Sequence, residues 1–132
     1  MWKIPWPWAK EQQSHAQCFR METEWGKRDG RQLGSYKMRA YFGEHEIGVA
    51  RGTYVNSIFK LDHIKVDEQY QSRGYGGCMI RELRAKARRR KCKEFVIIVN
   101  NANLNAIRLY RSLGAQQRQH ALGMSEYYIA NP

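Results

Sequence analysis

The chain has 132 residues, of which 42% are hydrophobic, and it carries a formal net charge of +11 at neutral pH. This length fits one compact domain, so we expect a single domain over residues 1–132, with an N-terminal Trp/Pro-rich extension at 1–16 and the core at about 17–130. No run approaches the ~20 apolar residues of a membrane span, and the N-terminus lacks a signal-peptide apolar core, so we expect no membrane attachment and a cytoplasmic location.

The first half of the chain predicts an irregular segment followed by strands. Residues 1–8 hold Trp2, Trp6 and Trp8 around two prolines, which rules out a regular helix there. These tryptophans would cover the core or contact a second subunit. A short surface helix is predicted at 9–17. Alternating apolar and polar residues then predict four strands, at 18–25, 33–42, 47–53 and 58–66.

The second half predicts helices alternating with strands. A helix runs from Gly76 to about residue 91, with Met79, Ile80, Leu83 and Ala87 on one apolar face. The remaining predicted elements are a continuous apolar strand at 95–99, a helix that Asn103 caps and Gly114 ends, and strands at 115–121 and 124–129.

Cysteine spacing and charge limit the class of site. Cys18, Cys78 and Cys92 show no metal-ligand spacing, and an odd number argues against a disulfide framework. We therefore expect reduced thiols and no metal site. The excess of positive charge would attract a polyanion, such as nucleic acid or an acidic protein surface, and does not choose between them.

A glycine-rich stretch at 66–77 joins the fourth predicted strand to the helix that follows. Backbone N–H groups at a helix N-terminus lack intrahelical partners, and the helix dipole adds positive potential, so this turn suits a phosphate or pyrophosphate. Gly74 and Gly76 would let the backbone approach such a ligand, and Arg73 adds a cation. The alternative is a strand-to-helix turn without a ligand.

Two common nucleotide motifs do not fit this stretch. A P-loop needs Lys-Ser or Lys-Thr after its last glycine, whereas Cys78 follows Gly77. A dinucleotide fingerprint needs a third glycine at the position of Met79.

Two segments resemble one family. Residues 71–76, Gln-Ser-Arg-Gly-Tyr-Gly, resemble the Gln/Arg-x-x-Gly-x-Gly/Ala signature of the GNAT superfamily of acyl-CoA-dependent N-acyltransferases. Residues 103–115 resemble the Asn-x-x-Ala-x-x-Leu-Tyr-x-x-Leu-Gly-Phe segment of the same superfamily, with Ala115 in place of the usual aromatic residue. The resemblance covers roughly residues 33–130. It implies an α/β (α+β) domain with a mixed, mostly antiparallel twisted sheet flanked by helices.

The resemblance also implies acetyl-CoA as the cofactor. Backbone groups of Ile64 and Val66 would pair with the pantetheine arm, and Asn103 resembles the asparagine of the family that contacts the cofactor. A backbone N–H near Ile64 to Val66 would bind the thioester oxygen. The turn that would surround the pyrophosphate consists of Gln71, Ser72, Arg73, Gly74, Tyr75, Gly76 and Gly77.

Candidate acid and base groups follow from the same resemblance. Tyr110 matches the tyrosine of the family that protonates or hydrogen-bonds the coenzyme A sulfur, and a phenol of pKa ~10 is protonated at neutral pH. Without the motif, a core tyrosine would be the simpler interpretation. Asp62 and His63 should point to opposite faces of their strand, so only one of them can face the cleft. For the base we expect Asp62, or a water. A solvent-facing pair with no role is the alternative.

The expected function is acetyl transfer from acetyl-CoA to a primary amine by direct attack, with a protein, small-molecule or RNA-linked acceptor. Family members have two helices between their first and second strands, and here only a turn is available at 26–32, so the acceptor side should be open. The open side and the tryptophans at 1–8 favour a homodimer. The alternative function is a non-catalytic binding module whose basic helix, with the cationic stretch 81–93, contacts nucleic acid or an acidic protein partner.

Overall fold

The structure, a computed structural model, describes residues 19–26 and 33–132. The Trp/Pro segment at 1–8, the helix predicted at 9–17, and Cys18 lie outside these residues. The described elements are β1 (Phe19–Trp25), β2 (Leu33–Phe42), β3 (His45–Val55), β4 (Ile58–Val66), the 3₁₀ turn η1 (Glu68–Tyr70), α2 (Tyr75–Arg89), β5 (Glu94–Asn100), α3 (Leu104–Ser112), β6 (Gln116–Ala121) and β7 (Met124–Ala130). Every strand predicted within this part of the chain is confirmed.

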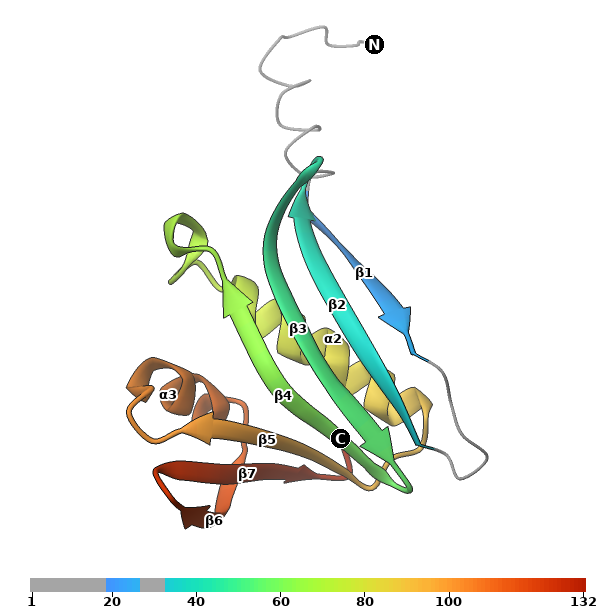
Figure 1. Ribbon diagram of the computed structural model, residues 1–132, viewed down its shortest axis with the longest axis vertical. Coiled ribbons are helices and arrows are strands. Elements are labelled where there is room, and N and C mark those ends of the chain that lie inside the picture. Colours follow the sequence, from blue (N-terminus) through green and yellow to red (C-terminus); the bar gives the residue numbers. More distant parts are fainter. Residues whose placement is uncertain (1–18, 27–32) are drawn as a thin grey trace, which may run out of the picture.

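The strands form one seven-stranded sheet in the order β1-β2-β3-β4-β5-β7-β6 (Figure 1). All neighbouring pairs are antiparallel except β4 and β5, which are parallel. A parallel pair needs a crossover connection, and α2 provides it between β4 and β5. The predicted mixed, mostly antiparallel sheet is therefore confirmed.

The core lies between the sheet and its helices. The stripe predicted on the first helix is confirmed, since Met79, Ile80, Leu83 and Ala87 of α2 are fully buried. They belong to one cluster with inward side chains of the strands and with Tyr110 of α3. Figure 1 shows α2 crossing behind the long strands of the sheet.

The opposite face of β1–β4 carries polar side chains, and we call it the outer face. On β2, buried Tyr36 and Met38 alternate with Ser35, Lys37 and Arg39, which point to the outer face. Buried side chains of both described helices contribute to the core on the other side of the sheet. The connection from Trp25 to Leu33 is too short for two helices, as expected from the sequence.

A β-bulge in β4 separates this strand from β5. In the pairing with β3, Arg51 lies opposite His63 and Gly52 lies opposite Leu61, so Asp62 is an extra residue without a partner. The parallel pairing of β4 with β5 stops at Leu61. Because a bulge bends its strand, we attribute the divergence of β4 from β5 to this extra residue.

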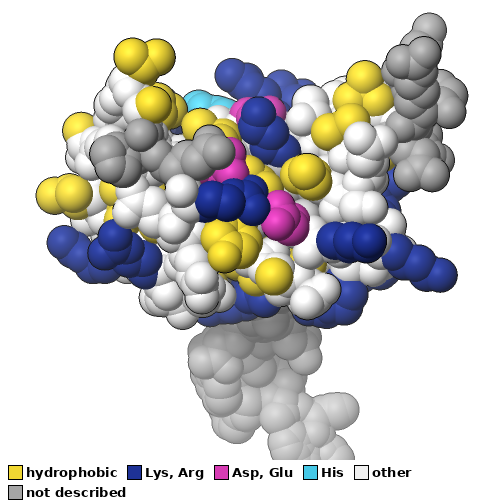
Figure 2. Space-filling model, turned by 90° about the horizontal axis from the view of Figure 1, so that it is seen from below, with side chains coloured by type: hydrophobic (Ala, Val, Ile, Leu, Met, Phe, Trp, Pro, Cys, Tyr) yellow, Lys and Arg dark blue, Asp and Glu magenta, His cyan; other side chains and the backbone are white. Residues whose placement is uncertain are grey.

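Basic residues outnumber acidic ones, with 23 Lys and Arg against 12 Asp and Glu. In the end-on view of Figure 2, Lys and Arg side chains are spread over the molecule, and the Asp and Glu side chains in view lie beside them. Within the described residues, no helix is long and apolar enough to cross a membrane. The same residues include no group of three or more His, Cys, Asp or Glu placed to hold a metal ion.

Candidate active site

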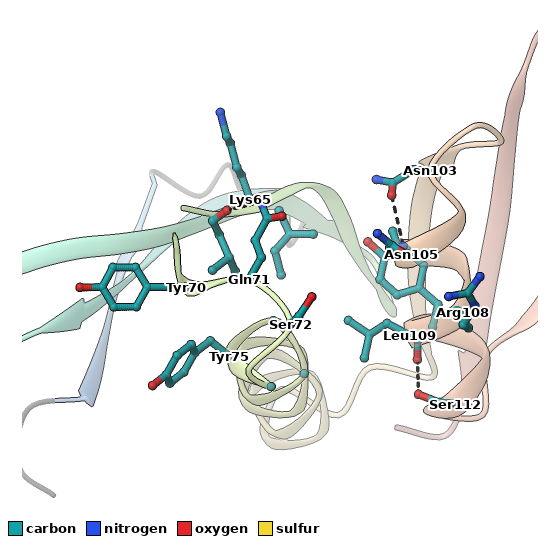
Figure 3. Close-up of a pocket in the computed structure, with 17 residues that line it drawn as sticks. Lys65, Tyr70, Gln71, Ser72, Tyr75, Asn103, Asn105, Arg108, Leu109 and Ser112 are labelled. Carbon is teal, nitrogen blue, oxygen red and sulfur yellow. Dashed lines mark hydrogen bonds between the residues drawn. The ribbon is translucent and has the colours of Figure 1, made fainter. Parts of the chain in front are cut away.

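A cavity of about 630 Å³ opens between the end of β4 and the N-terminus of α2 on one side and α3 on the other (Figure 3). The structure brings together ten residues that the sequence assigned to a cofactor site: Ile64, Val66, Gln71, Ser72, Gly74, Tyr75, Gly76, Gly77, Asn103 and Tyr110. They come from two segments that are far apart in the chain. Arg73 is exposed and does not line the cavity; its guanidinium carbon lies 6.0 Å from the centre of the Tyr70 ring.

The turn before α2 has the geometry of an anion site. Gly74 is the N-cap residue with φ +89°, and a Cβ built on it would meet no atom within 4 Å. Backbone hydrogen bonding of the helix begins with the Cys78 N–H, which donates to the Gly74 carbonyl at 3.0 Å. No side chain caps the helix, and its first turn has no acidic residue. The preceding N–H groups therefore remain available to a phosphate or pyrophosphate.

A hydrogen bond from Gln71 connects this turn to the end of β4. Its side-chain amide donates a hydrogen bond to the Val66 carbonyl at 2.7 Å, which spans η1. Ser72 takes a positive φ of 61°, which reverses the chain toward α2. The amide of Gln71 thus holds the loop, while Ser72 and Gly74 set its backbone path.

The α3 wall begins at Asn103, which has two roles. Its side-chain oxygen accepts a hydrogen bond from the Ala106 N–H at 3.2 Å, so the predicted N-cap is confirmed, and the residue also lines the cavity. The predicted helix end is confirmed too, since Gly114 has φ +91°.

Several lining residues were not predicted from the sequence: Lys65, Tyr70, Asn105, Ala106, Arg108, Leu109 and Ser112. On α3, Asn105, Arg108 and Ser112 recur at helical spacing on the side away from the core, and this polar stripe was the available signal. Lys65 and Arg108 are the charged residues of the lining, which contains no Asp or Glu. The cavity therefore favours an anionic ligand.

Tyr110 lines the inner part of the cavity with a ring that is only 3% exposed. Its ring packs against that of Tyr127, with 6.5 Å between the centroids. Burial raises the pKa of Tyr110 to about 12. No described residue accepts a hydrogen bond from its hydroxyl, so this residue of the cavity lining holds a phenol that is protonated at neutral pH and is not used by another protein group.

Asp62 lies outside this cavity, and one expectation about it was wrong. Because Asp62 is the bulged residue, it does not alternate with His63. His63 pairs in register with Arg51, an outer-face residue, and the Asp62 carboxylate lies 3.7 Å from Lys60 Nζ, also on the outer face. Both Asp62 and His63 therefore belong to the outer face. Asp62 lines a second, shallower groove of about 510 Å³ on that face, with Lys37 and Arg51.

The site therefore has two parts on opposite sides of β4. One is the anion-binding cavity with the Tyr110 hydroxyl, and the other is the outer groove with Asp62. The unpaired edge of β4 beyond Leu61 lies between them. A reaction that joins an anionic cofactor to a second substrate fits this arrangement.

Comparisons with known proteins agree with this geometry. The model of the acetyltransferase (GNAT) family matches residues 1–115. A search of curated proteins finds no match. An acetyltransferase of Bacillus subtilis in complex with CoA superimposes with a TM-score of 0.66 at 15% identity, covering 84% of this chain and 99% of the other. The ribosomal-protein-S18-alanine N-acetyltransferase of Escherichia coli gives a TM-score of 0.65 at 18% identity, covering 96% and 78%. At these identities the two structures bear on the fold alone.

Proposed function

Because the chain belongs to the acetyltransferase (GNAT) family, whose cosubstrate is acetyl-CoA, we propose that it transfers the acetyl group to a primary amine of an acceptor. One observation carries this proposal: the Gly74 turn and Tyr110 line the same cavity although they come from different motifs. The bare N–H groups of the turn fit a pyrophosphate, and the cations Lys65 and Arg108 add favourable charge. Bound acetyl-CoA would supply a thioester carbonyl for attack by the amine.

The residues of the cavity would hold this cosubstrate along its length. Residues 71–77 would bind the pyrophosphate, and Arg73 would act only at longer range because it does not line the cavity. Backbone groups of Ile64 and Val66 lie on the part of β4 that has no partner in β5, so they are available to the amide-containing pantetheine arm. A backbone N–H in this stretch would stabilise negative charge on the thioester oxygen.

Proton transfer would use groups on both sides of β4. The Tyr110 hydroxyl holds its proton well above neutral pH and would donate it to the departing sulfur. On the outer face, Asp62 is our candidate to accept the proton of the amine, directly or through a water. His63 becomes a second candidate because the bulge puts it on the same face.

The candidate acceptors are small amines, RNA-linked amino groups and proteins. The Escherichia coli relative acts on an alanine of ribosomal protein S18, which supports including protein amines. The test is to incubate the full chain with acetyl-CoA and members of each class, and to measure thiol release together with the mass of the product. We expect an acetylated product in at least one class. A protein that binds acetyl-CoA and acetylates none of them would favour a binding module.

The binding-module alternative depends on the basic residues around α2. Part of that charge is used inside the protein: Arg84 and Arg88 donate hydrogen bonds to the carbonyls of Leu113 and Pro132, and Arg90 stacks on Trp25. Exposed cations remain at Arg81, Lys91 and Lys93, whereas the exposed Arg89 pairs with Glu82 at 3.4 Å. Because Arg84, Arg88 and Arg90 already contact other parts of the protein, they are less available to a polyanionic partner. We therefore favour acetyl transfer over the binding module.

A further inference from the structure

The outer face contains a row of basic side chains, and no carboxylate of the described residues forms an ion pair with its two permanent cations, Lys37 and Arg51. Lys37 of β2 lies directly opposite Arg51 of β3, which lies opposite His63 of β4. Side chains opposite each other on antiparallel strands have Cβ atoms about 5 Å apart, and like charges in such positions destabilise the sheet. Neither Lys37 nor Arg51 belongs to an ion pair among the described residues. The chain thus retains an unfavourable pair on an accessible face.

The carboxylates next to this row have other partners. Glu24 is opposite Lys37 in the register, yet its carboxylate contacts Arg39 instead. Asp62 contacts Lys60 at 3.7 Å, and both of these side chains are about two-fifths exposed, so the contact is weak and exchangeable. Within one groove, two unpaired cations therefore stand beside a carboxylate that can change partner.

This arrangement fits a zwitterion better than a polyanion. A nucleic-acid backbone on the groove would meet the carboxylates of Glu24 and Asp62, which would repel it. A single carboxylate can bind Arg51 in a bidentate manner with Lys37 nearby. The protonated amine of the same molecule would then lie toward Asp62, next to the register position of Arg51. Amines with a pKa of ~10 reach the protein in this charged form.

We propose that the outer groove is the acceptor site for an amino carboxylate, in which Lys37 and Arg51 bind the carboxylate of the acceptor and thereby determine substrate specificity. The inference rests on the acetyl transfer proposed above. It also gives a reason for the like-charge pair, since a bound carboxylate removes the repulsion. The acceptor is either a free amino acid or a peptide whose first residue is acidic, because both place a carboxylate within a few bonds of the amine.

The test uses matched acceptor pairs with the full chain saturated with acetyl-CoA. One pair is a free amino acid and its carboxamide, and the other is a peptide amide beginning with Glu and the same peptide beginning with Gln. For each pair we would measure the ratio of kcat/KM for the carboxylate to kcat/KM for the amide. Comparing this ratio between wild type and variant cancels the different pKa values of the two amines. Whichever pair responds identifies the source of the carboxylate.

We expect Arg51→Gln and Lys37→Gln each to lower this ratio about tenfold or more, the effect of losing one charged hydrogen bond. Arg89→Gln is the control, because it removes the same charge from an exposed position on α2. Unchanged ratios in both outer-face variants, with amides still acetylated, would overturn the inference and leave the proposed function intact. Failure to acetylate any member of the pairs would also overturn the inference, and only failure with every acceptor class of the proposed function would count against the acetyl transfer itself.

A second readout does not require catalysis. Without acceptor and at low salt, Arg51→Gln should raise the thermal midpoint of unfolding, because the repulsion from Lys37 is gone. The free amino acid and the peptide amide beginning with Glu are added in separate titrations, and at least one of them should raise the midpoint of CoA-saturated wild type more than that of the variant. Equal shifts in the two proteins with both acceptors would contradict a carboxylate site at Arg51.

Discussion

The proposed proton donor Tyr110 owes its raised pKa to its buried position. The residue belongs to the core cluster and also lines the cavity, and its hydroxyl has no hydrogen-bond partner among the described residues. Tyr110→Phe keeps the packing and removes only the proton donor. We expect kcat to fall by roughly 10²-fold, in the range of general acid catalysis, while acetyl-CoA affinity changes little. Steady-state kinetics and calorimetry on the two proteins check this, and an unchanged kcat would exclude Tyr110 as the acid.

The same burial predicts a loss of stability at high pH. The pKa of Tyr110 is about 12 in the folded protein and ~10 in the unfolded chain. The neutral phenol is therefore favoured by folding, and this contribution is full below pH ~10 and is lost as the pH rises toward 12. At pH 11 the wild type should have lost about 1 kcal/mol that Tyr110→Phe does not lose. Urea unfolding at pH 9, 10 and 11 measures the difference, and parallel losses would refute it.

The places of single residues beside the cavity were predictable where a motif fixed them. Gly74 and Asn103 stand in motifs, and both line the cavity. Asn105 and Arg108 stand at motif positions where any residue is allowed, so only the geometry of α3 reveals their place. The contact of Arg73 with the cofactor stays a prediction, because its position in a loop does not determine where its long side chain points, and the side chain lies outside the cavity lining.

Asn103 caps α3 and is our candidate for a contact with the cofactor, and two substitutions separate these two roles. Asn103→Ala removes the cap and should cost about 1 kcal/mol of stability. Asn103→Ser keeps a capping oxygen, so stability should largely return. If the amide also contacts the cofactor, both variants should bind acetyl-CoA more weakly than wild type. Chemical unfolding and calorimetry report the two effects separately, and full affinity in Asn103→Ser would limit Asn103 to capping.

The β-bulge in strand β4 could not be predicted from the periodicity of the sequence. Strict alternation along residues 58–66 predicts that Asp62 and His63 face opposite ways, whereas the bulge gives them the same face. A bulge arises from the register between two strands, which are brought together only by folding. The seven strands and both helices were predictable because each carries its own hydrophobic pattern and turn residues.

At the scale of the whole molecule, the positive charge and the short β1–β2 connection have the widest consequences. The net charge of +11 should assist the binding of a highly anionic cosubstrate, and added salt should weaken that binding. The absence of two helices between β1 and β2 was predictable from chain length alone, because too few residues are available. The homodimer remains a prediction, for which sedimentation analysis is the measurement.

The most direct test of the account is calorimetric titration of the full chain with acetyl-CoA at low and moderate salt. Gly74→Glu places a negative charge at the turn and strains a position with φ +89°. Gly43→Glu is the matched control, because Gly43 also has a positive φ of 58° and open space around it, in the β2–β3 turn. We predict saturable one-site binding in wild type and Gly43→Glu, weaker at the higher salt, and no binding in Gly74→Glu. Absence of binding by the wild type at low salt, or full affinity in Gly74→Glu, would contradict the cofactor site and the function built on it.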